Sequence, residues 1–403
     1  MAHNESAIGH TQTMNQWIPY GRQDINQSDI DAVVVVLKSD WITQGPAIER
    51  FEQAVANYCG AKYAVAVSSA TAALHIACLA VGLGKGDSLW TSPNTFVASA
   101  NCGLYCGADV DFVDIDPRTY NLSVDELEGK LAWADQQGCL PKVIVPVHFA
   151  GQSCEMARMA ELSQRYGFKI IEDAAHGIGG RYQEQPIGSC QFSDMTVFSF
   201  HPVKIVTTGE GGMIITNRKD LYEKLIRLRT HGITRNSNLM KGESHGSWYY
   251  QQLELGFNYR MTDIQAALGA SQLQRLDEFV ERRRFLANRY NQLLQDLPLI
   301  LPWQHPDTDS SWHLYVVRLK LDKISKTHGQ VFEELRQVGI GVNLHYIPVH
   351  THPYYQQLGF AWGDFPQAEC YYQKAISLPL YYGLTVEEQD RVVTKLQDIL
   401  RLP

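Results

Sequence analysis

Hydrophobic and polar positions along this chain follow two periods. Short apolar runs, the pattern typical of strands buried in a parallel sheet, recur between stretches in which apolar positions return every three or four residues, as on one face of a helix. The predicted strands cover residues 63–67, 88–91, 110–114, 142–146, 168–173 and 213–216, with another β-type run beginning at residue 195. The predicted helices cover 29–37, 48–58, 68–79, 124–133, 154–166 and 220–229, and a long helix follows residue 255 and runs through residue 279. This alternation predicts an α/β fold with a mostly parallel sheet covered by helices.

The pattern changes near Ala270, where the predicted elements become a strand over 312–319, a helix over 330–338 and an extended segment over 342–350. A chain of 403 residues exceeds what one core usually fills. We therefore predict a large domain over 14–269 and a smaller α+β C-terminal domain over 270–403. Residues 1–13 are polar and aperiodic, which predicts a disordered or vector-derived tail. Residues 233–250 are rich in Gly, Ser, Asn and Tyr and predict a mobile loop.

Composition narrows the class of protein. The net charge of −8 and the lack of a basic run longer than residues 281–284 argue against nucleic-acid binding. No segment approaches about 18 uninterrupted apolar residues, so we expect neither a signal peptide nor a membrane span. Eight cysteines without metal-type paired spacing favour reduced thiols in a cytoplasmic protein. Four histidines of the C-terminal half lack carboxylates at helical spacing, so we assign them to substrate contact or packing and predict no metal site. They are His313, His345, His350 and His352.

One stretch, from Met195 to Met213, carries candidate chemistry. Its apolar run delivers a single lysine, Lys204, into a loop that closes on Gly209, Gly211 and Gly212. A lysine amine in a dry, structured pocket loses its proton easily and condenses with an aldehyde. Most lysines are exposed, so this stretch by itself favours a solvated loop lysine.

A carboxylate upstream changes that balance. Asp173 ends the strand predicted over 168–173, and residues at the carboxyl ends of parallel strands face the ligand crevice. Asp173 and Lys204 are therefore expected at the ends of two strands, one crossover apart. Pyridoxal 5′-phosphate (PLP) requires such a pair: a lysine that holds its aldehyde as a Schiff base, and an aspartate that keeps the pyridine nitrogen protonated.

Two further segments fit the same cofactor. Residues 68–71 open a predicted helix with small hydroxyl residues, so the backbone N–H of Ala70 and the hydroxyl of Thr71 are candidate donors to a phosphate. The alternative is a plain helix cap. Phe96 offers a flat aromatic face for stacking on the cofactor ring, and its alternative is a place in the core.

Five ordered motifs together resemble the DegT/StrS-type sugar-nucleotide aminotransferases, and the resemblance runs from about Trp17 to the end of the chain. The motifs are Ser68–Leu74, Pro93–Asn101, Glu172–His176, Phe198–Lys204 and Gly256–Asp263. The resemblance implies a fold-type-I PLP transferase in which Lys204 is catalytic. It also implies a homodimer with shared active sites, in which Asn258 reaches the phosphate of the neighbouring subunit's cofactor. Retention of a lysine argues against the family's dehydratase branch, whose members replace it with histidine.

The same resemblance assigns further contacts. Ser199 is expected to hold the phosphate with Thr71 and Asn258, and His176 to contact the ring hydroxyl, where many relatives carry glutamine. The loop over 40–46 is expected to line the substrate pocket, although an ordinary connector anchored by its tryptophan is the alternative. The implied substrate contacts are Trp41, Thr43, Gln44, His345 and Tyr346.

The implied reaction moves the amino group of L-glutamate to a keto sugar carried on a nucleotide, with Lys204 moving the proton between the donor α-carbon and C4′ of the cofactor. The His-Pro-Val-Lys variant at 201–204 and residues 342–356 are similar to the branch that acts in pseudaminic acid synthesis. That branch acts on carbon 4 of a UDP-linked 6-deoxy-4-keto-N-acetyl sugar. The alternatives are another nucleotide-linked keto sugar (dTDP or a different carbon), a small keto acid as substrate, or a non-catalytic PLP-binding regulatory protein.

Overall fold

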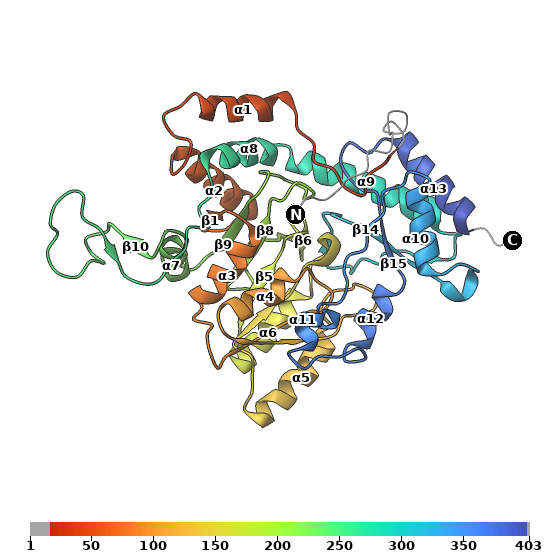
Figure 1. The fold of residues 1–403 in the computed structure, drawn as a ribbon, viewed down its shortest axis with the longest axis horizontal. Helices are drawn as coiled ribbons and strands as arrows, with labels where there is room; N and C mark the ends of the chain where they lie inside the picture. The colour runs from red at the N-terminus through yellow and green to blue at the C-terminus, as the bar shows by residue number, and fades with distance from the viewer. Residues whose placement is uncertain (1–16, 401–403) are drawn as a thin grey trace, which may run out of the picture.

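A seven-stranded sheet forms the centre of the molecule in this computed structural model, which describes residues 17–400 (Figure 1). Its strands, in spatial order, are β1 (Tyr63–Val67), β9 (Gly212–Thr216), β8 (Met195–Ser199), β5 (Lys169–Asp173), β4 (Val143–Val145), β2 (Ser88–Thr91) and β3 (Asp109–Phe112). Within this sheet β9 alone runs antiparallel to its neighbours. The predicted mostly parallel sheet is thereby confirmed. The tail predicted over 1–13 lies outside the described residues.

Both faces of the sheet are covered because its strands are apolar on both sides. In β1, Val65 and Val67 pack on the face covered by α3 (Ala70–Ala80), α4 (Ala98–Tyr105) and α7 (Lys219–Arg229). Ala64 and Ala66 point to the opposite face. That face is covered by α2 (Pro46–Cys59) and α8 (Asp263–Leu273) near β1, and by α5 (Val124–Gln137) and α6 (Met156–Tyr166) near β4. Helix α1 (Gln27–Leu37) packs on α8.

The long helix predicted through residue 279 is instead two helices. Helix α8 ends at Leu273, and α9 (Leu276–Leu294) begins after a break at which Arg275 leaves helical geometry, with φ −104° and ψ 8°. The Arg275 guanidinium lies 2.7 Å from a carboxylate oxygen of buried Asp29, 246 residues away in sequence. Local periodicity does not register a contact between residues so far apart, which is why the pattern looked continuous.

Helix α9 leads into the C-terminal unit (Figure 1). Its first turns, with Phe279 and Val280, pack in the core of the large sheet, and its later turns, with Leu286 and Tyr290, pack in the C-terminal core. The C-terminal core is formed by side chains from three antiparallel strands and two helices. The strands are β12 (Leu299–Ile300), β14 (Tyr315–Leu319) and β15 (Ala375–Leu378), and the helices are α10 (His328–Gln337) and α13 (Val386–Leu400). The segment predicted as extended over 342–350 forms only an isolated bridge, from Asn343 to Ser377, before a short 3-10 turn.

Short elements complete the fold. They are β6 (Arg181–Tyr182), β7 (Gln185–Pro186), β10 (Ile233–Thr234), β11 (Gln251–Gln252), β13 (Thr308–Asp309), α11 (Pro353–Gln356) and α12 (Pro366–Tyr372). Strands β10 and β11 pair at the base of a long loop that projects from the body beside α7 (Figure 1). Between residues 17 and 400, no helix has the length and apolar character needed to cross a bilayer.

Candidate active site

A cavity of about 440 Å³ opens where β5 and β8 end and α3 begins. It brings together eight of the residues singled out from the sequence. These are Ala70, Thr71, Phe96, Asp173, Ser199, Lys204, His345 and Tyr346. The carboxyl ends of parallel strands meet at one edge of the sheet, as expected for an open α/β fold.

Lys204 belongs to the loop that joins β8 to β9. Backbone bonds fix this loop: Phe200 N–H donates to Gly211 O at 2.9 Å, and Thr208 N–H donates to Phe200 O at 3.0 Å. The amine lies in the cavity wall, where burial lowers the pKa of Lys204 to about 8, although the charge of Asp173 acts in the opposite direction. A larger share of this amine is therefore free to act as a nucleophile near neutral pH than for an exposed lysine.

Asp173 ends β5 with its carboxylate buried and held by two donors. The N–H of Ala175 donates to Oδ1 at 3.1 Å, and the hydroxyl of Ser99 donates to Oδ2 at 2.6 Å. Both donors stabilise the ionised carboxylate, because a charge removed from water needs hydrogen-bond partners. Asp173 thus presents a fixed negative group to the same cavity as the Lys204 amine.

The start of α3 offers an anion site beside them. Ser69 caps the helix: its hydroxyl accepts from Ala72 N–H at 3.1 Å, and its carbonyl accepts from Ala73 N–H. Within the described part of the chain, the N–H groups of Ala70 and Thr71 have no acceptor, so they remain available to a phosphate. Gly212 allows β9 to pass this turn closely, since a Cβ there would lie 2.5 Å from the backbone carbon of Ser69.

Aromatic side chains form part of the cavity wall. Phe96 lines the cavity and is 58% exposed, so the alternative of a core phenylalanine is wrong. His176 does not line the cavity but lies directly behind it, with Nε2 3.0 Å from the Tyr346 hydroxyl. The Nδ1 atom of His345 lies 2.8 Å from the Ser377 hydroxyl. Burial, reinforced by the charge of Lys204, lowers the pKa of His345 to about 3.

Several cavity residues were not assigned to the site from the sequence, among them Tyr20 and His313. Tyr20 comes from the N-terminal segment, and its backbone carbonyl accepts a hydrogen bond from Leu380 N–H. His313 was grouped only with the histidines assigned to contact or packing. Its ring lies 4.4 Å from that of His176, and its buried Nδ1 has no partner among the described residues. The signal that the sequence offered for His313 was its place near the start of the strand predicted over 312–319, and this signal was not specific.

Besides His176, four predicted site residues lie outside this cavity. Asn258 is exposed, and Trp41 is exposed on the loop before α2. Thr43 pairs with Thr262 in an isolated bridge, which brings the loop of Trp41 alongside the segment after Asn258. Gln44 lines a separate depression of about 240 Å³. Within one chain, these residues do not meet Lys204.

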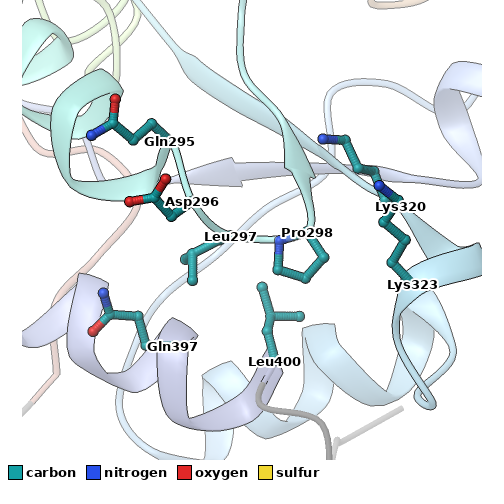
Figure 2. A pocket seen from close by; sticks show the side chains of 8 residues that line it. All are labelled: Gln295, Asp296, Leu297, Pro298, Lys320, Lys323, Gln397 and Leu400. Atoms are coloured by element: carbon teal, nitrogen blue, oxygen red, sulfur yellow. The ribbon is translucent and has the colours of Figure 1, made fainter.

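A larger surface depression, of about 660 Å³, belongs to the C-terminal unit and shares no lining residue with the Lys204 cavity. Figure 2 shows Lys320 and Lys323 on one side of Pro298, with Asp296 on the other. The charged side chains here are exposed or half-buried. The depression therefore offers no desolvated reactive group and is not the candidate active site.

The residues around Lys204 fit PLP. The amine, the hydrogen-bonded carboxylate and the free helix N–H groups match the cofactor's aldehyde, its ring nitrogen and its phosphate. The fold and this site define a PLP-dependent transaminase. The chain belongs to the DegT/DnrJ/EryC1/StrS aminotransferase family, whose model matches residues 23–397.

Relatives and solved structures agree with this assignment. The spore coat polysaccharide biosynthesis protein SpsC of Bacillus subtilis (strain 168) is 40% identical over 393 residues, which cover 97% of this chain and 99% of SpsC. The structure of Helicobacter pylori PseC, an aminotransferase involved in the biosynthesis of pseudoaminic acid, superposes with a TM-score of 0.86 at 30% identity, over 95% of this chain and 99% of PseC. The PLP form of Spr1654 from Streptococcus pneumoniae, a proposed sugar aminotransferase, gives a TM-score of 0.84 at 30% identity, over 96% and 100% of the two chains. This protein is therefore a PLP-dependent sugar aminotransferase.

Proposed function

We propose that this enzyme moves the amino group of L-glutamate to the 4-keto group of a UDP-linked 6-deoxy-N-acetyl keto sugar and forms a UDP-4-amino sugar for pseudaminic acid synthesis. The observation that carries the proposed chemistry is the Lys204 amine, whose pKa is lowered to about 8 in the same cavity as Asp173. Bound PLP supplies an electron sink for the α-carbon of the amino donor. The residues of the chain then have to bind, orient and move protons.

Each proposed role follows from a position in the cavity. Lys204 moves a proton between the donor α-carbon and C4′ of the cofactor, because its amine is free to accept a proton near neutral pH. Asp173 holds the proton of the ring nitrogen. Thr71, with the N–H of Ala70 and the hydroxyl of Ser199, binds the phosphate. Phe96 stacks on the ring, which requires its face to be open to the cavity.

His176 and two residues of the C-terminal unit, His345 and Tyr346, also have proposed roles. His176, behind the Tyr346 hydroxyl, supports the side of the site where the ring hydroxyl lies. His345 and Tyr346 contact the substrate. His345 is buried and Tyr346 is half-buried, which restricts their side-chain motion, so they orient a substrate at a low cost in conformational entropy.

The proposed substrate rests on similarity to PseC at 30% identity over nearly the full chain, together with the His-Pro-Val-Lys sequence at 201–204. A second candidate is a different nucleotide-linked keto sugar, with dTDP as carrier or another carbon as acceptor. The observation in its favour is the higher identity, 40%, to a protein named for spore coat polysaccharide synthesis.

A homodimer with shared active sites is part of the proposal. Asn258 and the loop of Trp41, Thr43 and Gln44 lie on surface outside the Lys204 cavity, and the bridge between Thr43 and Thr262 keeps them together. Residues clustered in this way can complete a cavity of the partner subunit. We propose that Asn258 reaches the phosphate there and that Trp41, Thr43 and Gln44 contact the sugar nucleotide.

The substrate is tested by supplying the holoenzyme with glutamate and a panel of nucleotide keto sugars. The panel contains UDP and dTDP carriers and 3-keto and 4-keto sugars, and product formation is followed by mass spectrometry. A mass consistent with an amino group in place of the keto oxygen, formed fastest from the UDP-linked 4-keto-N-acetyl sugar, is the expected result. Faster turnover of a dTDP sugar would favour the second candidate, and turnover of free keto acids alone would contradict both.

A further inference from the structure

The carboxylate of Asp173 is held by a side chain that the reaction described so far does not use. Ser99, in the first turn of α4, places its hydroxyl oxygen 2.6 Å from Oδ2 of Asp173, across 74 residues of sequence. We propose that Ser99 is a positioning residue for amino transfer, which holds the Asp173 carboxylate in the orientation that pairs with the protonated ring nitrogen of PLP. This inference rests on the role proposed above for Asp173.

The direction of the hydrogen bonds follows from counting protons. The Ser99 oxygen also lies 2.7 Å from the Thr95 hydroxyl oxygen and 3.4 Å from the Phe96 carbonyl. A serine hydroxyl has one proton, and the ionised carboxylate is both the nearest acceptor and the strongest. Ser99 therefore donates to Asp173, and Thr95 donates to Ser99. In such a chain the outer bond polarises the inner one, which strengthens the donation to the carboxylate.

Burial raises the energetic cost of losing the hydrogen bond from Ser99 to Asp173. Thr95, Ser99 and Asp173 are 2%, 0% and 5% exposed, so water has little access to replace a missing hydroxyl. The Ala175 N–H already occupies Oδ1. With one donor on each oxygen, the carboxylate cannot rotate freely, while Asp173 still lines the cavity. Removal of the Ser99 donor would leave a buried charge with an unmet acceptor, which is far more costly than the loss of an exposed bond.

The same short segment also carries the ring's stacking partner. Phe96 lies between Thr95 and Ser99, and its side chain lines the cavity that Asp173 lines. The turn that leads into α4 therefore positions both Phe96, which stacks on the ring, and Asp173, which pairs with the ring nitrogen. Displacement of Ser99 from Asp173 would disturb both contacts with the cofactor.

The test measures PLP affinity of the Ser99→Ala enzyme by equilibrium dialysis, beside the glutamate half-reaction. We expect affinity and half-reaction rate to fall about ten- to hundredfold, the range for loss of a bond to a buried charge. The matched control is Ser163→Ala. Ser163 lies in α6, away from the cavity, and its hydroxyl donates to the Phe168 carbonyl at 2.7 Å. This control is expected to keep both values. Ser99→Thr keeps the hydroxyl and is expected to restore most of the affinity.

A PLP analogue with C–H in place of the ring nitrogen separates positioning from mere packing. If Ser99 acts through the ring nitrogen, the affinity ratio of wild type to Ser99→Ala should fall to near one with this analogue. An unchanged ratio, or a Ser99→Ala enzyme that binds PLP as wild type does, would overturn the inference. Asp173→Asn distinguishes failure of the Ser99 role from failure of the Asp173 role. If Asp173→Asn weakens PLP binding while Ser99→Ala does not, only the role of Ser99 fails. If neither variant weakens binding, the proposed role of Asp173 fails as well.

Discussion

The Tyr346 hydroxyl and Nε2 of His176 lie 3.0 Å apart, and this bond joins the C-terminal unit to the large sheet at the wall of the cavity. The N–H of Ala150 donates to the other ring nitrogen, Nδ1, at 3.3 Å. Burial, followed by the charges of Lys204 and His345, holds the pKa of His176 well below its usual value, so the ring is neutral. A neutral ring that accepts at Nδ1 carries its proton on Nε2, so His176 donates to Tyr346.

This assignment predicts the effect of Tyr346→Phe. The change leaves the Nε2–H group of His176 buried without an acceptor, which costs about 1–3 kcal/mol of folding free energy. The apoprotein should melt a few degrees lower, as measured by differential scanning calorimetry. Tyr354→Phe is the control, because the Tyr354 side chain is exposed. Equal melting temperatures for the two variants would contradict the assignment.

Lys204→Ala should abolish amino transfer and leave PLP bound weakly, because the phosphate and ring contacts remain while the covalent attachment is lost. Borohydride reduction and peptide mass spectrometry provide the measurement. The wild-type peptide that contains Lys204 should gain the mass of the reduced cofactor, and the variant peptide should not. Lys320→Ala, in the separate C-terminal depression, serves as the control and should behave as wild type. Full activity of Lys204→Ala would refute the role of this lysine.

The lowered pKa of Lys204 predicts how the apoenzyme takes up PLP. Burial disfavours the charged amine, so its proton leaves at about pH 8 and not near 10.5. About a tenth of the amine is then neutral at pH 7, against roughly 0.03% for an unperturbed lysine. The rate of covalent PLP attachment, followed by stopped-flow absorbance, should rise about tenfold per pH unit below pH 8 and level off above it. A rise that continues to pH 10 would show that burial does not control this amine.

The shared site predicts complementation between two inactive variants. Lys204→Ala removes the amine, and Asn258→Asp places a negative charge at the proposed phosphate contact, which repels the phosphate. In an equal mixture after subunit exchange, half of the dimers are hybrids, and each hybrid has one intact site. Activity should return to roughly a quarter of wild type. Mixtures that stay inactive, although native mass spectrometry shows hybrid dimers, would argue that each chain builds its own site.

The sequence predicted most elements of the fold, because their patterns are local. Strand β1 was expected and found over Tyr63–Val67, and α5 begins at Val124 as predicted. The prediction of one continuous helix over α8 and α9 was wrong, and the contact at this position is not local. The break there falls at Arg275, whose guanidinium bonds Asp29 in a segment that no local pattern connects to it.

For the site, the sequence pointed to Asp173, because a polar residue at the end of an apolar strand lies at the edge of a parallel sheet, and to Lys204 in the loop after another strand of that sheet. Which side chains surround these two residues depends on the packing of the whole chain. Ser99 reaches Asp173, and Tyr20 and His313 reach the cavity, from segments far away in sequence. These contacts depend on how helices and the C-terminal unit pack on the sheet. Packing brings distant residues together without leaving a periodic signature in the chain.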